Sequence, residues 1–215
     1  MTDKKEAHAR LAQYANEYSL DAKKIDLLIE YLALLRQWNG SHNLTSIVDW
    51  LEMVDLHVLD ALTVLPFIYG KAVLDVGSGA GVPGIPLAIA CSELAVHSVD
   101  SRRKKIQFQI HAQHALGVTN FFPVHSRVEQ YQPGQKFDTL ACRAFASLEL
   151  FVKSSIDLCK PNGRLLAMKG AYPADELEKL SPEVVDVIAV HELSIPGRAL
   201  TSRHLVEMAP ANCKN

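Results

Sequence analysis

The sequence contains no apolar stretch long enough to cross a membrane, and the residues near its start include no signal-peptide core. Its four cysteines are scattered, with no C-x-x-C pair and no spacing typical of metal ligands. These absences argue against a membrane protein, a disulfide-stabilised secreted protein and a metal site. We therefore expect a cytoplasmic protein with reduced thiols, no metal and no membrane partner.

The chain also lacks an excess of either charge. Its 22 Lys and Arg residues oppose 24 Asp and Glu residues, which gives a formal net charge of −2. Proteins that bind nucleic acid non-specifically are usually basic, so any RNA-binding role has to depend on a local basic patch. With 215 residues, of which 48% are hydrophobic, the chain is long enough for one ordinary soluble domain with a terminal extension.

The most informative stretch is AVLDVGSGAGVPG, at residues 72–84. It begins as a short apolar run, typical of a strand that is buried on both faces. Four glycines follow: Gly77, Gly79, Gly81 and Gly84. Glycine permits positive φ and a close approach of the backbone to a ligand, and the start of the next helix offers free N–H groups. A strand, a glycine-rich turn and a helix predict the first unit of a nucleotide-binding α/β fold.

Two classes of cofactor use such a turn, and its register distinguishes them. In a dinucleotide site, G-x-G-x-x-G begins at the tight turn that ends the strand, which is Gly77 here, but the last position of that register is Val82. Asp75 suits a cationic sulfonium better than a pyrophosphate. Asp100 closes the next apolar run, where a carboxylate can accept both ribose hydroxyls. The residues favour S-adenosylmethionine, with an NAD-dependent oxidoreductase as the alternative.

Helical patterns occupy the first third of the chain. One apolar stripe predicts a helix that ends at residues 39–40, Asn-Gly, and Asp49 is expected to cap the next helix. Strand and helix patterns then alternate, which predicts a mostly parallel sheet covered on both faces. The predicted strands are residues 72–76, 95–100, 121–124, 137–142, 164–168, 184–190 and 204–208. We expect an N-terminal helical extension over residues 1–69 and a core over residues 70–215, together forming one compact unit.

A few polar side chains outside the turn are candidates for the site. Arg143 follows a predicted strand at its C-terminal end, where ligands bind in such sheets. Lys169 ends another strand and is a candidate phosphate contact, with plain exposure as the alternative. Asn43 and His57 either line the site or have buried structural roles. The basic run at residues 102–105 is interpreted as a solvated helix face, with an RNA-binding stripe as the alternative.

Several short segments together resemble one known family. They are NLTS at residues 43–46, HVLDA at 57–61, DVGSGAGVPGIPL at 75–87, VDS at 99–101, SRVEQ at 126–130, RAFAS at 143–147 and MKG at 168–170. In this order they resemble the GidB family, also called RsmG, over nearly the whole chain. The resemblance implies a Rossmann-like class I methyltransferase with a seven-stranded sheet. It also implies methyl transfer from S-adenosylmethionine to N7 of one guanine in the 16S rRNA of the small ribosomal subunit.

The turn and the resemblance together assign the cofactor-binding residues. These are Gly77, Gly79, Val82, Asp100, Val128, Glu129 and Arg143. The resemblance alone places Val128 and Glu129, beside the adenine edge. Asn43 and Lys169 are the candidates for contact with the substrate. Leu56 and Ala61 stand where the family commonly has Arg and Ser, which leaves open whether that helix makes a basic contact.

The implied reaction requires little from acid–base chemistry. Guanine N7 carries an exposed lone pair that attacks without first losing a proton, so positioning should matter more than a general base. Accordingly, no Ser-His-Asp or Cys-His set is predicted to be catalytic. A non-catalytic RNA-binding or ribosome-binding protein that keeps the fold is the alternative from another functional class.

Overall fold

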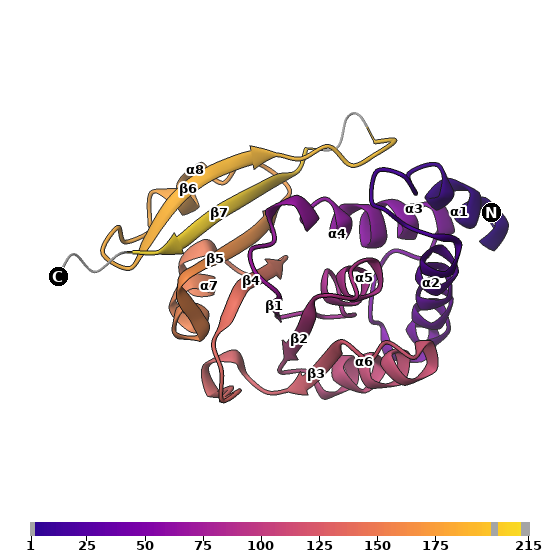
Figure 1. The fold of residues 1–215 in the computed structure, drawn as a ribbon, viewed down its shortest axis with the longest axis horizontal. Coiled ribbons are helices and arrows are strands. Elements are labelled where there is room, and N and C mark those ends of the chain that lie inside the picture. Colours follow the sequence, from indigo (N-terminus) through magenta and orange to yellow (C-terminus); the bar gives the residue numbers. More distant parts are fainter. Residues whose placement is uncertain (1–2, 199–201, 212–215) are drawn as a thin grey trace.

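The computed structural model describes residues 3–198 and 202–211, and a seven-stranded sheet forms its centre (Figure 1). The strands are β1 (Ala72–Val76), β2 (Ala95–Asp100), β3 (Phe121–His125), β4 (Phe137–Arg143), β5 (Cys159–Lys169), β6 (Val185–Glu192) and β7 (His204–Pro210). Their order across the sheet is β3-β2-β1-β4-β5-β7-β6. The first five are parallel, and β7 runs antiparallel to both of its neighbours. The predicted α/β fold with a mostly parallel sheet is confirmed.

Helices precede the sheet and connect its strands. They are α1 (Lys4–Ala12), α2 (Ala22–His42), α3 (Trp50–Met53), α4 (Asp60–Leu62), α5 (Gly84–Ala90), α6 (Arg103–Leu116), α7 (Leu148–Ser155) and α8 (Ala174–Leu177). The carboxylates of Asp3, Asp21 and Asp49 accept hydrogen bonds from first-turn N–H groups and so begin α1, α2 and α3. The capping role predicted for Asp49 is therefore confirmed.

One helical prediction in the N-terminal part is wrong in detail. Helix α2 continues past Gly40 to His42 and ends at Asn43, whose φ of 50° lies in the left-handed region. A glycine inside a helix costs only about 1 kcal/mol, and asparagine also tolerates this left-handed position, so the tertiary structure selects the end. The next helix is not regular throughout, because residues Val54–Leu59 between α3 and α4 form a wider π-helical turn.

Strand β5 begins earlier than predicted, at Cys159. Residues 161–163 lie within this strand at an irregularity, since its register against β4 shifts after the pair Phe137↔Cys159. A Cβ on Gly163 would approach Cys159 Sγ at 2.6 Å, so the strand requires glycine at this close contact.

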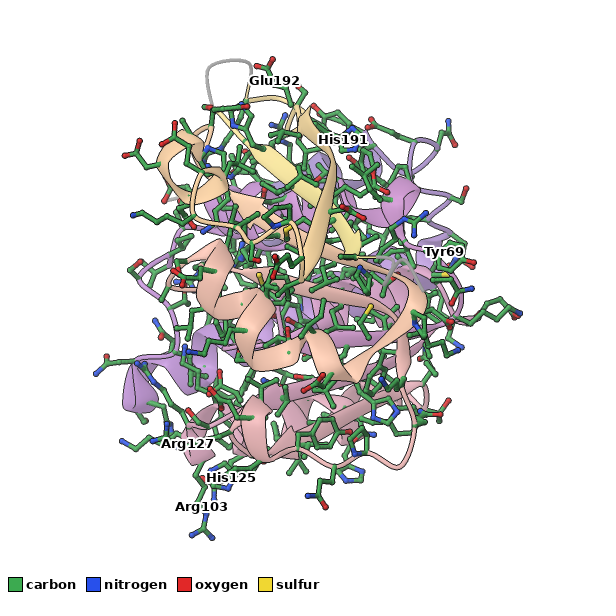
Figure 2. The ribbon with its side chains drawn as sticks, turned by 90° about the vertical axis from the view of Figure 1, so that its left-hand side faces the viewer. Tyr69, Arg103, His125, Arg127, His191 and Glu192 are labelled. Carbon is green, nitrogen blue, oxygen red and sulfur yellow. The ribbon has the colours of Figure 1, made fainter. Side chains whose placement is uncertain are left out.

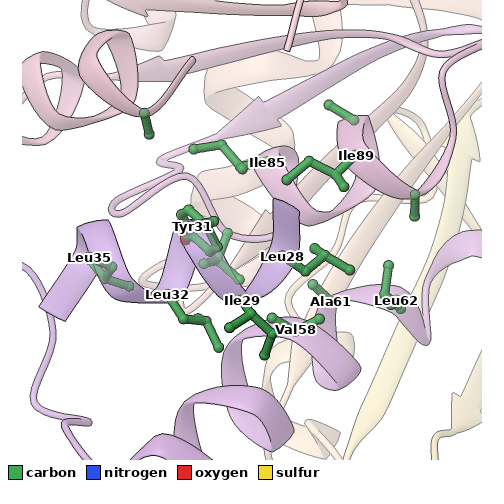
Figure 3. Packing of buried hydrophobic residues seen from close by; sticks show 14 of the residues in the cluster. Leu28, Ile29, Tyr31, Leu32, Leu35, Val58, Ala61, Leu62, Ile85 and Ile89 are labelled. Carbon is green, nitrogen blue, oxygen red and sulfur yellow. The ribbon is translucent and has the colours of Figure 1, made fainter. Parts of the chain in front are cut away.

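Successive residues of β1 point to opposite faces of the sheet and join two different apolar clusters. Val73 packs in the cluster that includes α2, α5 and α6, whereas Leu74 packs in the cluster that includes α7. Figure 3 shows Tyr31 of α2 on the side of that helix that faces Ile85 of α5. Helix α2 therefore covers α5 and α6 as an outer layer on one face of the sheet.

Because of this shared cluster, the N-terminal helices bury their apolar side chains against the same helices that cover the sheet. The division into an extension over residues 1–69 and a core over residues 70–215 stays a prediction, and both ranges include terminal residues outside the described part. Cys213 also lies outside it. No helix in residues 3–198 and 202–211 is long and apolar enough to span a bilayer.

A candidate ligand-binding site at the carboxyl edge of the sheet

A cavity of about 450 Å³ opens at the carboxyl ends of β1, β2 and β4. The strand order reverses between β1 and β4, and open α/β sheets bind ligands at such a switch point. Four short segments supply most of its lining, at residues 77–82, 99–102, 126–129 and 143–146. The first two follow β1 and β2, and the last follows β4, so the parallel sheet itself brings these segments together.

The glycine turn presents its backbone to this cavity. Gly77, Gly79 and Gly81 have φ values of 68°, 59° and 84°, in the left-handed region that side-chain-bearing residues rarely adopt. The N–H of Gly77 donates to the Val99 carbonyl at 2.9 Å, which attaches the turn to the end of β2. A Cβ on Gly77 would lie 3.2 Å from the ring of Phe145, so this position is restricted by both conformation and space.

A buried network of hydrogen bonds holds the glycine turn against β2 and α6. The Gln109 amide of α6 donates to Ser78 Oγ and to the Gly79 carbonyl, each at 2.8 Å. Ser98 of β2 lies 2.6 Å from both Ser78 Oγ and Gln109 Oε1. The sequence motif did not predict Gln109, because its link to the turn depends on how α6 packs against the sheet.

Helix α2 holds the same turn from the other side. The Tyr31 hydroxyl donates to the Ala80 carbonyl at 2.9 Å, and the Tyr31 side chain is fully buried (Figure 3). A residue of the N-terminal helical part thus fixes the backbone of the turn, which connects that part of the chain to the cavity.

Asp75 does not lie where the sequence suggested. Its side chain is fully buried beneath the first turn of α5, outside the lining of the cavity, and its Oδ2 accepts the N–H of Gly84 at 2.8 Å. The other carboxylate oxygen has no hydrogen-bond partner. Burial raises the pKa of Asp75 to about 7. The interpretation of Asp75 as a direct partner of a cationic ligand is therefore not supported by its position.

Asp100 does line the cavity, in a fixed orientation. Its Oδ2 accepts the N–H of Gly79 at 2.9 Å and its Oδ1 accepts the N–H of Arg102 at 2.7 Å. Each oxygen keeps a second lone pair for a ligand hydroxyl. On the facing loop, Val128 supplies an almost buried apolar wall and Glu129 an exposed carboxylate.

Arg143 forms the far wall and is held by the π-helical turn. Its guanidinium donates to the Leu56 carbonyl, to Asp60 Oδ2 at 3.2 Å and to His57 Nδ1 at 3.2 Å. Burial and the neighbouring Arg143 lower the pKa of His57 to about 4, so the imidazole is neutral near pH 7. Since arginine can only donate, His57 Nδ1 accepts and its Nε2–H donates to Thr45 Oγ1 at 3.0 Å.

A second cavity of about 330 Å³ lies on the other side of Arg143. Ile47, Leu56 and Met168 form apolar parts of its wall, and Lys169 and Arg203 supply cations. Asp60 is 2% exposed and serves both arginines, since Arg203 Nε donates to Asp60 Oδ1 at 3.2 Å. Lys169 Nζ contacts both oxygens of Glu176, at 3.0 and 2.7 Å.

The structure brings together most of the residues predicted from the sequence. All seven expected cofactor-binding residues line the first cavity: Gly77, Gly79, Val82, Asp100, Val128, Glu129 and Arg143. His57 lines it as well, and Lys169 lines the second cavity. Asn43 lines neither of these two cavities and instead ends α2 with an exposed side chain, while its neighbour Leu44 reaches the first.

Two residues of the second cavity were missed. Asp60 stands within the HVLDA segment, where its spacing from His57 was the only available signal. Arg203 lies far along the chain without a motif and meets Asp60 only because β7 inserts beside β5. The described residues contain no cluster of three or more His, Cys, Asp or Glu that could hold a metal ion.

Curated relatives resemble this chain over most of its length. A protein of Nitrosococcus oceani is 46% identical over 191 residues, which cover 89% of this chain and 88% of the relative. One from Stutzerimonas stutzeri is also 46% identical, covering 87% of each chain, and one from Coxiella burnetii (strain Dugway 5J108-111) is 42% identical, covering 84% and 86%. All three are named ribosomal RNA small subunit methyltransferase G.

Solved structures agree on the fold. The glycopeptide N-methyltransferase MtfA complexed with S-adenosyl-L-methionine superimposes with a TM-score of 0.62 at 12% identity, covering 72% of this chain and 87% of that one. A SAM-dependent methyltransferase from Aquifex aeolicus gives 0.55 at 20% identity, covering 74% and 93%. The fold is thus that of the Rossmann-like class I methyltransferases. The model of the GidB family, described as rRNA small subunit methyltransferase G, matches residues 24–206, and this chain belongs to that family.

Proposed function

We propose that this protein transfers a methyl group from S-adenosylmethionine to N7 of a specific guanine in the 16S rRNA of the small ribosomal subunit. The observation that carries this proposal is the pair of adjoining cavities that meet at Arg143. One is formed around a glycine turn of the cofactor-binding type, and the other combines apolar walls with cations. Membership of a family described as rRNA small subunit methyltransferase G supports the substrate class.

The residues of the first cavity fit S-adenosylmethionine. Its volume of about 450 Å³ falls within the range of small-molecule sites, roughly 300–1,000 Å³. The absence of a side chain at Gly77 leaves the backbone open to a ligand beside Phe145, and Asp100 is oriented to accept ribose hydroxyls. Val128 offers an apolar surface for the adenine. When bound, S-adenosylmethionine supplies a methyl group on a cationic sulfonium, which makes that methyl electrophilic.

The second cavity is proposed to receive the target nucleotide. Leu56 and Met168 offer apolar contact to the faces of a base, while Lys169 and Arg203 suit a phosphate. Leu56 replaces the arginine common in the family with part of this apolar wall. Ala61, the other departure, is fully buried in the core and is therefore far from any substrate contact. The basic groups of this cavity come instead from β4, β5 and the residue that precedes β7.

Charged side chains around the second cavity are proposed to position the substrate. Asp60 and Glu176 partly neutralise the three cations Arg143, Lys169 and Arg203, which leaves this cluster with one net positive charge. Such a balance attracts a phosphate without strongly repelling the cationic base that N7 methylation produces. No side chain has to remove a proton, because N7 attacks through a free lone pair. The neutral His57 therefore serves to hold Arg143 in place rather than as a general base.

The test is methyl transfer from labelled S-adenosylmethionine to small subunits that lack the modification, followed by mapping of the labelled base. We expect label at a single N7-methylguanine. Label at another atom or in another RNA would refute the proposed substrate. Cofactor binding without transfer to any RNA would favour the alternative of a non-catalytic RNA-binding protein.

Arg143 is tested in the same assay. Arg143→Ala should lower turnover or cofactor affinity without unfolding the protein, and Arg143→Lys should recover little, because lysine cannot reproduce the fork that contacts His57 and Asp60. Full activity and full cofactor affinity in Arg143→Ala would remove this residue from the site.

A further inference from the structure

A group of exposed basic side chains lies beside the first cavity and is not explained by cofactor binding. Its members, which we call the α6–β3 basic surface, are Arg102, Arg103, Lys104, His125 and Arg127. We propose that this surface docks backbone phosphates of the substrate RNA, at nucleotides other than the one methylated. This inference rests on the proposed function, because it assumes an RNA substrate.

The two segments that carry these side chains are neighbours in space. Strands β2 and β3 pair in parallel with Asp100 opposite His125, and Ser126 N–H donates to the Asp100 carbonyl at 3.2 Å. A ring nitrogen of His125, Nε2, also lies 3.1 Å from the Ser101 carbonyl. Figure 2 shows Arg103, His125 and Arg127 together at the lower edge of the molecule, pointing outward. The start of α6 and the end of β3 therefore present one continuous surface.

The charges of this surface are available to a partner. Within residues 3–198 and 202–211, none of Arg102, Arg103, Lys104 and Arg127 forms an ion pair with a carboxylate. The carboxylate of Asp100, which lies at the same edge, already accepts two backbone N–H groups. By contrast, the cations of the second cavity each contact Asp60 or Glu176.

Helix stability does not explain the placement. Cations in the first turn of a helix oppose its dipole, and α6 has no acidic residue there. Lys105, which follows them, turns inward instead: it lines the first cavity, and its Nζ lies 3.4 Å from the Leu44 carbonyl. In a protein with a net charge of −2, this local excess is the basic patch that an RNA role requires.

The position of the surface sets the geometry of docking. Arg102 and Arg127 lie at the rim of the first cavity, on its β3 side, whereas the second cavity lies on the β4 and β5 side. Strands β3 and β5 are four strand spacings apart, or about 20 Å at roughly 4.8 Å per spacing. An RNA that reached both regions would cross the mouth of the first cavity, so the phosphates held by the surface are not those of the target nucleotide.

The test uses a double variant, Arg103→Glu with Lys104→Glu, because neither residue lines either cavity. The matched control is Lys136→Glu, since Lys136 is exposed and precedes β4, at the opposite edge of the sheet. Binding of 16S rRNA and of small subunits is measured by filter retention over a range of salt concentrations, beside cofactor affinity and methyl transfer.

We expect the double variant to bind RNA about tenfold more weakly at 0.1 M salt, because two phosphate contacts are lost. The slope of log affinity against log salt should fall by about 1.4 to 1.8 in magnitude. Cofactor affinity should not change, and the control should match the parent protein in every measurement. RNA affinity and a salt slope equal to those of the control would overturn the proposal.

The same measurements separate this inference from the proposed function. Weaker RNA binding in the double variant, together with no methyl transfer by the parent protein, would support the surface and refute the proposed activity. Methyl transfer by the parent protein, together with unchanged RNA binding in the double variant, would support the proposed activity and refute the RNA-docking role of the surface. A parent protein that bound neither RNA nor subunits would refute both.

Discussion

The two cavities on either side of Arg143 are held together by different forces. The first is formed around the backbone of one short turn, which hydrogen bonds from Gln109 and Tyr31 hold in place. The second depends on ionic contacts between side chains from α4, β4, β5, α8 and the residue that precedes β7. A cavity shaped by backbone tolerates most side-chain substitutions. A cavity whose arginines are held by one buried carboxylate, that of Asp60, depends heavily on that residue.

This difference follows from what each cavity is proposed to bind. A small cofactor requires close approach to the backbone, which glycines permit. A nucleotide within a large RNA requires cations at fixed positions, and long basic side chains are ordered only when partners hold them. Asp60 provides that order for Arg143 and Arg203 at once.

The largest effect is expected from Asp60→Ala, which removes the shared partner of two partly buried arginines. Breaking a buried ion pair in this way costs about 3–5 kcal/mol of unfolding free energy. Methyl transfer should be lost as Arg143 and Arg203 move, while cofactor affinity changes less. Chemical denaturation and cofactor titration measure the two effects. Unchanged stability and activity would show that the second cavity does not depend on Asp60.

The pH dependence of stability tests the buried carboxyl of Asp75, which accepts a hydrogen bond from α5 next to the first cavity. With a pKa of about 7 in the folded state, against an ordinary value of 3.8, the folded protein holds a proton that the unfolded chain releases. The free energy of unfolding should therefore decrease as pH rises from about 4 to 7, by up to about 4 kcal/mol. In Asp75→Asn this decrease should disappear. Parallel pH profiles for the variant and the parent would contradict it.

Gly77→Ala tests the backbone of the first cavity alone. An alanine at a φ of 68° costs about 1–2 kcal/mol and meets the ring of Phe145. We expect cofactor affinity to fall about tenfold, with RNA binding retained. The matched control is Gly40→Ala, where the glycine is helical with open space around it, and alanine should stabilise the protein by about 0.5–1 kcal/mol. Equal cofactor affinity in the two variants would contradict the prediction.

The smallest effect is expected from Glu176→Gln, which removes a partly exposed partner of Lys169. Burial raises the pKa of Glu176, but hydrogen bonds from Lys169 and from the Leu148 N–H outweigh it and lower this pKa below its ordinary value of 4.5. The carboxylate therefore stabilises the fold above about pH 4.5, and this contribution is lost as pH falls through the lowered pKa. Because of solvent screening, we expect less than about 1 kcal/mol at pH 7. Thermal unfolding at pH 7 and at pH 3 measures it, and a larger loss at pH 3 would contradict the assignment.

The predictions from the sequence that the structure confirms depend on patterns of neighbouring residues. All seven strands and the glycine turn follow from apolar runs and from glycines at adjacent positions, since strand formation and positive φ depend on nearby residues. The turn then led to Asp100 and Arg143, because parallel strands place their carboxyl ends at one edge. The predicted end of α2 was wrong by a few residues. Both Gly40 and Asn43 can end a helix, and only packing distinguishes them.

The sequence, together with the family resemblance, thus predicted the fold class and seven of the residues that line the first cavity. Only the tertiary structure decided that Asp75 is buried below α5 and that Asp60 joins Arg143 to Arg203. It alone placed the cations of α6 beside those that follow β3. The physical reason is sequence separation: a backbone turn is specified by residues a few positions apart, whereas an ion pair between distant segments depends on how strands and helices pack.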